Sequence, residues 1–159
     1  MKNTGIATRA SKGIVQGYLG DSTGRLAPEP SAYGENAGAA GAMYGTVADL
    51  MLFDQALYSE RLLKKASIAE MYTSHPELGY VACGSWVYDY YFLPSSPLVV
   101  ERRGRSFGFN HAFIRLPGIN KTLIILSNND RFDPDTFGNL DSFKDRLIKV
   151  LVEQPKFLP

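Results

Sequence analysis

Three arginines and one glycine stand close together near the middle of the chain: Arg102, Arg103, Gly104 and Arg105. Guanidinium groups bind carboxylates and other anions, and a glycine at the end of a strand lets a ligand approach the backbone closely. These four residues are therefore the candidate substrate-binding residues. A strand edge that is protected by charge has the same composition, and composition alone favours that simpler interpretation.

Other side chains that can do chemistry give weaker candidates. The two histidines, His75 and His111, lack the nearby acidic partners that a catalytic or metal site needs. The acidic segment from Asp130 to Asp135 lacks the spacing and the glycine of a calcium loop, and we expect a solvated turn there. We therefore expect no catalytic residue, no metal site and no cofactor.

The arginines must be positioned by strands. An apolar lead-in at Leu98 enters the arginine segment, a second apolar run follows Phe109, and a third covers residues 122–126, with turn residues between them. This order predicts an antiparallel meander. Alternation along the first strand places Val99, Glu101, Arg103 and Arg105 on one face and Val100, Arg102 and Gly104 on the other.

Helical patterns flank the meander. Thr46 is placed to cap a helix that reaches Leu57, with Asp49 as in a capping box. We expect one side of that helix to be mostly apolar; it carries Val47, Leu50, Met51, Asp54 and Leu57. A second helix is predicted over residues 66–73, where Ser67 and Glu70 form another capping pair.

A last helix is predicted over residues 140–153 and should lie against the sheet. Its expected apolar face consists of Leu140, Phe143, Leu147, Val150 and Leu151.

The remaining segments complete the prediction. The aromatic and β-branched run 81–92 is expected to be one strand, and residues 1–38 are expected to be an irregular loop with one short strand over 13–19. The fold class is thus α+β, with an antiparallel sheet of three or four strands, helices packed on it, and the C-terminal helix against the sheet. Residues 1–159 are expected to form a single domain.

Composition bounds the function. The 159 residues are 45% hydrophobic, which favours a folded globule, and 17 Lys+Arg nearly balance 16 Asp+Glu. The charge balance gives no sign of a nucleic-acid partner, and no apolar run has the length of a membrane span. A lone cysteine, Cys83, excludes an internal disulfide. The sequence does not indicate a compartment.

The order of local motifs resembles the C-terminal half of the serine β-lactamase-like family, which groups class C β-lactamases, DD-peptidases and related esterases. The segments that carry the resemblance are 1–5 (MKNTG), 38–50 (GAAGAMYGTVADL), 62–71 (LLKKASIAEM), 79–86 (GYVACGSW), 102–104 (RRG), 108–110 (GFN) and 123–128 (LIILSN). Single matches are weak, but their order along nearly the whole chain is fairly specific. The resemblance implies a partial β-lactamase or transpeptidase-like fold.

The resemblance also assigns roles. It places Arg102 at the family's Lys or His position, Arg103 at the middle position, and Gly104 at the glycine beside which substrate lies. Arg105 follows, where a backbone N–H of the family contributes to the oxyanion hole. Arginine can clamp a carboxylate but stays protonated, so it cannot act as a base. The substrate implied is a small ester, amide or peptide.

Two family motifs are missing. Neither Ser-x-x-Lys nor Tyr-x-Asn occurs in the chain, and the Tyr-x-Ser match at Tyr72 falls within the predicted second helix. We therefore expect the chain to be the C-terminal, substrate-side portion of a serine hydrolase, inactive alone. The alternative is a non-catalytic module that binds or self-associates through an exposed strand edge or the basic strip. A homo-oligomer through that edge is expected under both.

Overall fold

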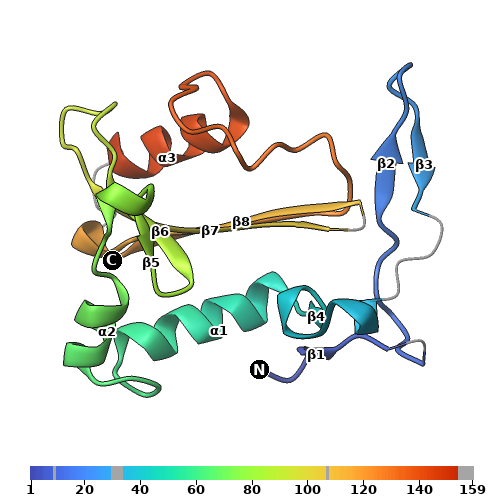
Figure 1. Ribbon diagram of the computed structural model, residues 1–159, viewed down its shortest axis with the longest axis horizontal. Helices are drawn as coiled ribbons and strands as arrows, with labels where there is room; N and C mark the ends of the chain where they lie inside the picture. The colour runs from blue at the N-terminus through green and yellow to red at the C-terminus, as the bar shows by residue number, and fades with distance from the viewer. Residues whose placement is uncertain (9, 30–33, 107, 154–159) are drawn as a thin grey trace.

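A five-stranded antiparallel sheet forms the centre of the fold. The computed structural model describes residues 1–8, 10–29, 34–106 and 108–153. The sheet has the strand order β5-β6-β7-β8-β9. It lies between helix α3 on one face and helix α1 on the other (Figure 1). The class is α+β, as predicted, but the main sheet has five strands instead of three or four.

The predicted meander is confirmed. Its strands are β7 (Leu98–Ser106), β8 (Phe109–Leu116) and β9 (Lys121–Ser127), each antiparallel to the next. The turn between β8 and β9 is the 3-10 helix η3 (Pro117–Ile119), after which Asn120 adopts a left-handed conformation. The two faces of β7 are those expected, because Val99 belongs to the core under α3 and Val100 to the opposite side.

The prediction of one strand over residues 81–92 is wrong. The segment is a hairpin of β5 (Val81–Ala82) and β6 (Ser85–Asp89). Gly84 in the turn has a φ of 76°, a conformation that glycine adopts without strain. This tight reversal adds the fifth strand to the sheet.

Helix α1 (Val47–Tyr58) begins where predicted, and the Thr46 side chain accepts a hydrogen bond from the Asp49 N–H. The carboxylate of Asp49 does not complete a capping box. It accepts hydrogen bonds from the Asn3 N–H at 2.7 Å and the Thr4 hydroxyl at 2.8 Å, and so ties the N-terminal segment to α1.

The second helix, α2 (Lys65–Met71), starts earlier than predicted. Its N-cap is Lys64, without a side-chain capping bond, so Ser67 lies inside the helix and the predicted Ser67–Glu70 capping pair is wrong. A 3-10 turn, η2 (Pro76–Leu78), then leads into β5.

The N-terminal region is more regular than the predicted loop. It contains two small antiparallel strand pairs. One pair joins β1 (Gly5–Ile6) to β4 (Met43–Tyr44), and the 3-10 helix η1 (Gly34–Ala40) precedes β4. The other pair joins β2 (Tyr18–Gly20) to β3 (Leu26–Pro28). The predicted short strand therefore begins only at Tyr18. The β2–β3 hairpin stands across one end of the main sheet (Figure 1), where the Tyr18 N–H donates to the Asn128 carbonyl.

The C-terminal helix α3 (Phe143–Glu153) packs on the sheet as predicted, and Ile148 joins a core that includes Ile114 and Leu116. The predicted apolar face is wrong in part. Phe143 is 62% exposed, whereas Lys144 and Asp145 are buried. Two charged side chains can face the sheet because the sheet supplies polar partners for both, which are described below.

Helix α1 also differs from its expected pattern. Leu57 is buried, but Val47 and Met51 are 45% and 39% exposed, while the charged Asp54 is buried against the sheet. Its partner is the buried Arg115 of β8. Among the described residues, no helix is both long enough and apolar enough to cross a membrane.

Candidate ligand-binding site on strand β7

Strand β7 has an open edge over its C-terminal half. Its pairing with β6 ends at the Trp86–Glu101 pair, whereas its pairing with β8 continues to Ser106. No described strand pairs with residues 102–106 on the β6 side. Backbone N–H and C=O groups at such an edge can bind an extended ligand.

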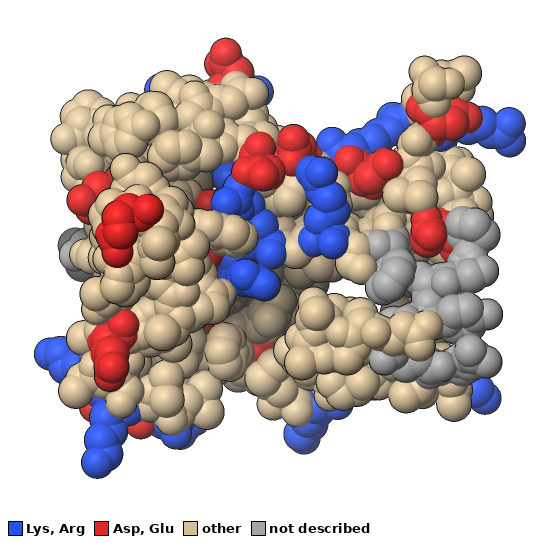
Figure 2. All heavy atoms as spheres, in the orientation of Figure 1, with Lys and Arg blue, Asp and Glu red and all other residues tan. Residues whose placement is uncertain are grey.

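Two of the three arginines are already paired with carboxylates. Arg103 contacts Asp135, and its guanidinium carbon lies 4.3 Å from the centre of the Trp86 ring. Arg105 donates to Asp133 at 2.7 Å. Figure 2 shows basic side chains directly beside acidic ones near the centre of the face that it draws. The predicted solvated turn is confirmed at these two positions, because the Asp135 and Asp133 side chains are 73% and 54% exposed; their carboxylates also balance the arginines.

Arg102 differs from its neighbours. It points to the other face of β7, it is exposed, and no described carboxylate pairs with it. Its guanidinium carbon lies 5.6 Å from the centre of the Trp86 ring. Gly104, two residues on, is exposed, and a Cβ there would meet only the His111 Cβ at 4.0 Å. The edge thus combines an available cation with room for close approach.

A buried ion pair supports this part of β7 from the α3 side. The Lys144 ammonium donates to Glu101 at 2.9 Å and to the Pro134 carbonyl at 2.9 Å. The Tyr88 hydroxyl donates to the other Glu101 oxygen at 2.6 Å. Burial and the adjacent Glu101 charge raise the pKa of Tyr88 far above its ordinary value, so Tyr88 stays a hydrogen-bond donor.

A second buried carboxylate lies beside the first. Asp145 accepts hydrogen bonds from the Tyr90 hydroxyl, from Ser142 Oγ at 2.6 Å and from Thr136 Oγ1 at 2.8 Å. Sequence reasoning missed both charged groups of α3. The sequence did contain a signal for this pair. Lys144 lies four residues before the apolar Ile148, and so on the same face of the helix, and Glu101 interrupts an otherwise apolar strand.

A pocket of about 360 Å³ adjoins the open edge near the β7–β8 turn. Its lining residues are Leu19, Arg105, Ser106, Gly108, Asn110, Asp130 and Asp133. The buried Asn110 side chain donates to the Phe132 carbonyl at 2.6 Å and thereby fixes the acidic loop beside the pocket. Gly108 has a φ of 71°, and a Cβ there would meet the Tyr18 nitrogen at 2.6 Å. Only glycine lets the β2 segment close this end of the site.

The histidines take structural positions. His75 has an acidic partner after all, since its Nδ1 lies 3.1 Å from Glu77, but both side chains are exposed. His111 Nδ1 accepts a hydrogen bond from the Ser127 N–H at 3.2 Å, and burial lowers the pKa of His111. Among the described residues, no group of three or more His, Cys, Asp or Glu side chains is arranged to hold a metal.

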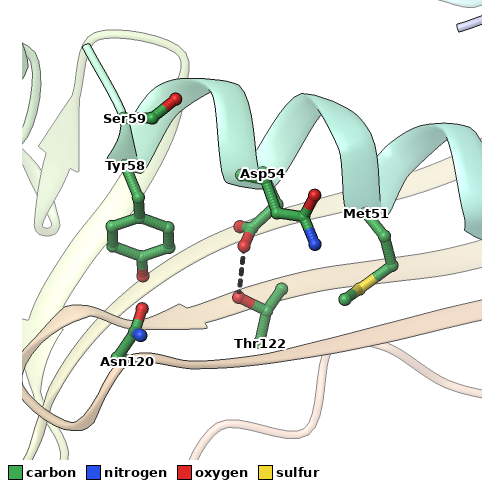
Figure 3. A pocket seen from close by; sticks show the side chains of 7 residues that line it. Met51, Asp54, Tyr58, Ser59, Asn120 and Thr122 are labelled. Atoms are coloured by element: carbon green, nitrogen blue, oxygen red, sulfur yellow. Dashed lines mark hydrogen bonds between the residues drawn. The ribbon is translucent and has the colours of Figure 1, made fainter.

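Tyr72 of the Tyr-x-Ser match lies away from β7's open edge. Its hydroxyl contacts Arg115, which also pairs with Asp54 of α1. A separate hollow of about 340 Å³ lies beside this cluster, between α1 and the start of β9. Figure 3 shows Met51 and Tyr58 from α1 facing Thr122 and Asn120 across it, with Thr122 bonded to Asp54.

Comparison with known proteins gives a likeness of fold. No family model matches the chain, and no curated protein matches it by sequence. The structure is similar to a solved structure of D-amino acid amidase from Ochrobactrum anthropi SV3 complexed with D-phenylalanine, with a TM-score of 0.62 and 24% identity. The match covers 94% of this chain and 49% of that chain, so this chain spans about half the amidase's length. The likeness shows that the two chains share a fold over this half of the amidase.

Proposed function

We propose that this chain forms the substrate-binding side of a serine-hydrolase site with a β-lactamase-like fold, for small ester, amide or peptide substrates that carry a carboxylate. The observation that carries the proposal is the open edge of β7 beside Arg102, the one arginine of the segment for which the described residues offer no carboxylate. A substrate carboxylate can bind this guanidinium while the substrate backbone lies along residues 102–106.

The other residues at this edge have different roles in the proposed site. Gly104 leaves space for the substrate, and Trp86 offers an aromatic surface next to the guanidinium groups of Arg102 and Arg103. Arg103 and Arg105 hold the acidic loop through Asp135 and Asp133. In this proposal they shape the site, and Arg102 binds the anion.

Acyl transfer needs a nucleophile and a base that this edge does not supply. Serine must be activated by a neighbouring base, and arginine cannot take that role. The chain contains no Ser-x-x-Lys. We therefore expect that the chain by itself binds such substrates without hydrolysing them.

Covalent labelling tests the catalytic part of the proposal. The purified chain is treated with a fluorophosphonate and with a fluorescent penicillin, and its intact mass is measured. We expect no mass increase and no hydrolysis of p-nitrophenyl esters or nitrocefin. A stoichiometric adduct on any serine would contradict the proposed division of roles, and peptide mapping would name the nucleophile.

Binding is tested separately by titration with N-acetyl-D-phenylalanine, which carries the aromatic group and carboxylate of the ligand in the amidase structure. We expect amide NMR shifts at residues 102–106 and at Trp86. Shifts confined to other strands would overturn the assignment of the site. A second measurement separates the proposed hydrolase half from a non-catalytic binding module. Hydrolysis after addition of a chain that carries Ser-x-x-Lys supports the hydrolase half, whereas binding without hydrolysis in that mixture supports the non-catalytic module.

A further inference from the structure

The outer edge of β9 is a second open edge, on the opposite side of the sheet from β5. Strand β9 pairs with β8 along all seven of its residues, and no described strand pairs with its other side. After Lys121 at its start, the strand contains no charged residue and no proline, and its centre is Leu123-Ile124-Ile125-Leu126. Such an edge adds another strand readily.

The side chains at this edge are only partly covered. Every residue of β9 is partly or fully exposed, although α1 and α3 lie on the two sides of the sheet (Figure 1). Leu126 is 38% exposed. Because side chains alternate along a strand, Leu126 points to the same face as Thr122, which is bonded to Asp54 of α1. Leu126 therefore projects on the α1 side.

We propose that β9 pairs with β9 of a second copy of this chain, antiparallel and centred on Ile124, to give one continuous ten-stranded sheet. In this register Ile124 lies opposite Ile124 of the second copy, and Thr122 lies opposite Leu126. A two-fold axis through this point pairs all seven residues of β9. The proposal is independent of the site on β7, which lies beyond β8 in the same sheet.

The register brings an exposed leucine to an open hollow. The 340 Å³ hollow between α1 and β9 is lined by Thr122, Met51 and Tyr58, among others. In the proposed register, Leu126 of the second copy lies opposite Thr122 and so enters this hollow, and the two-fold symmetry makes the contact reciprocal. The shape of this edge thus fits its own copy.

The charges at the edge also permit a second copy. The two acidic residues of α1 are Asp49 and Asp54, and both are buried and hydrogen-bonded within the chain. The ammonium of Lys121 is turned toward α3, where it contacts the Leu151 carbonyl, and the register places Ser127 of the second copy opposite it. Among the described residues of β9 itself, this register places no like charges opposite each other.

The experiment measures the mass of the full chain in solution by light scattering and analytical ultracentrifugation. We expect a dimer at tens of micromolar. Leu126→Lys should raise the dissociation constant about tenfold or more, because it removes an apolar side chain from the hollow. The matched control is Leu78→Lys, at an exposed leucine of η2, and it should leave the dimer unchanged.

Cysteine pairing tests the register itself. In a Cys83→Ser background, Ile124→Cys should form an intermolecular disulfide on mild oxidation, because the two copies of this residue lie directly opposite each other. Leu126→Cys is the control, because its two copies are about 13 Å apart along the strands and cannot bridge. A monomeric wild-type chain, or equal crosslinking of both variants, would overturn the proposal; a monomer would leave the edge to a strand of a different chain.

Discussion

The two open strand edges of the main sheet carry opposite chemistry. The edge of β7 over residues 102–106 contains three arginines and a serine, and its glycine leaves space for a ligand. The edge of β9 is apolar over residues 123–126. Charge discourages the addition of another strand, whereas an uncharged edge favours it. The difference indicates that the β7 edge suits a polar ligand and the β9 edge suits a second sheet.

The supports beneath the two edges differ in the same way. β7 rests on the buried ion pair of Glu101 and Lys144, whereas β9 places Leu123 and Ile125 against the apolar core under α3. A buried ion pair contributes little net stability, but it has strict geometric requirements. We infer that the ion pair fixes the direction of β7 at the point where its pairing with β6 ends.

The largest expected effect comes from breaking that ion pair. Lys144→Met keeps the side-chain length but removes the nearer cation of the buried Glu101 carboxylate and leaves only Arg103, whose Nε lies 3.9 Å away. This change should lower the free energy of unfolding by about 3 kcal/mol. Urea denaturation followed by circular dichroism measures the change. Ile125→Val, the control beneath the other edge, should cost only about 1 kcal/mol.

A double variant sharpens this comparison. Glu101→Gln combined with Lys144→Met removes both charges, so it should recover part of the stability lost in Lys144→Met alone. If the single variant is no less stable than Ile125→Val, then the β7 edge does not depend on buried charge and the proposed contrast between the supports fails.

An intermediate effect is expected at the arginines. Arg102→Gln should weaken binding of N-acetyl-D-phenylalanine about tenfold, because it removes a charge-assisted hydrogen bond of the kind worth ~1.5 kcal/mol or more. Arg105→Gln is the matched control. Because Arg105 is already paired with Asp133, this variant should change the affinity for N-acetyl-D-phenylalanine less than threefold. Titration by NMR measures both. A larger loss in Arg105→Gln than in Arg102→Gln would contradict the assignment of roles.

The smallest effect concerns pH and His111, which lies on β8 between the two edges, opposite Gly104 and Leu126. Burial lowers the pKa of His111, so the unfolded chain takes up this proton at a higher pH than the folded protein does. The contribution of neutral His111 to the free energy of unfolding should therefore be fully present above the ordinary histidine pKa. The free energy of unfolding should fall as the pH drops from 7.5 to 5.5. Urea midpoints at the two pH values measure this, and His111→Gln should reduce the difference. An unchanged difference would show that other groups cause it.

Much of the fold was predictable from the sequence because local patterns agree with it. Thr46 caps α1, the three apolar runs form the β7–β8–β9 meander, and a helix follows at the C-terminal end. The β5–β6 hairpin was missed because its turn, Cys83-Gly84, interrupts an otherwise continuous aromatic and β-branched run. The organisation of residues 1–159 as a single domain remains a prediction.

The sequence predicts the arginines of β7 as one group, and their role in binding remains a prediction. The sequence pointed to Arg102, Arg103 and Arg105 as a group. What distinguishes Arg103 and Arg105 from Arg102 is their pairing with Asp135 and Asp133. These carboxylates lie about 30 positions later in the sequence and contact β7 only in the folded chain. No local pattern reports which carboxylate meets which guanidinium, because such pairs form only when the loop after β9 folds over the sheet.

The sequence by itself determined the class of fold, the order of its main elements and the chemical difference between the two edges, because strand alternation, caps and turns act over a few residues. Only the tertiary structure decided which charges are buried. Lys144 and Asp145 face the sheet instead of solvent because Glu101 and Tyr90, distant in sequence, supply their hydrogen bonds. The cost of burying a charge depends on its partners, and those partners are set by packing over long range.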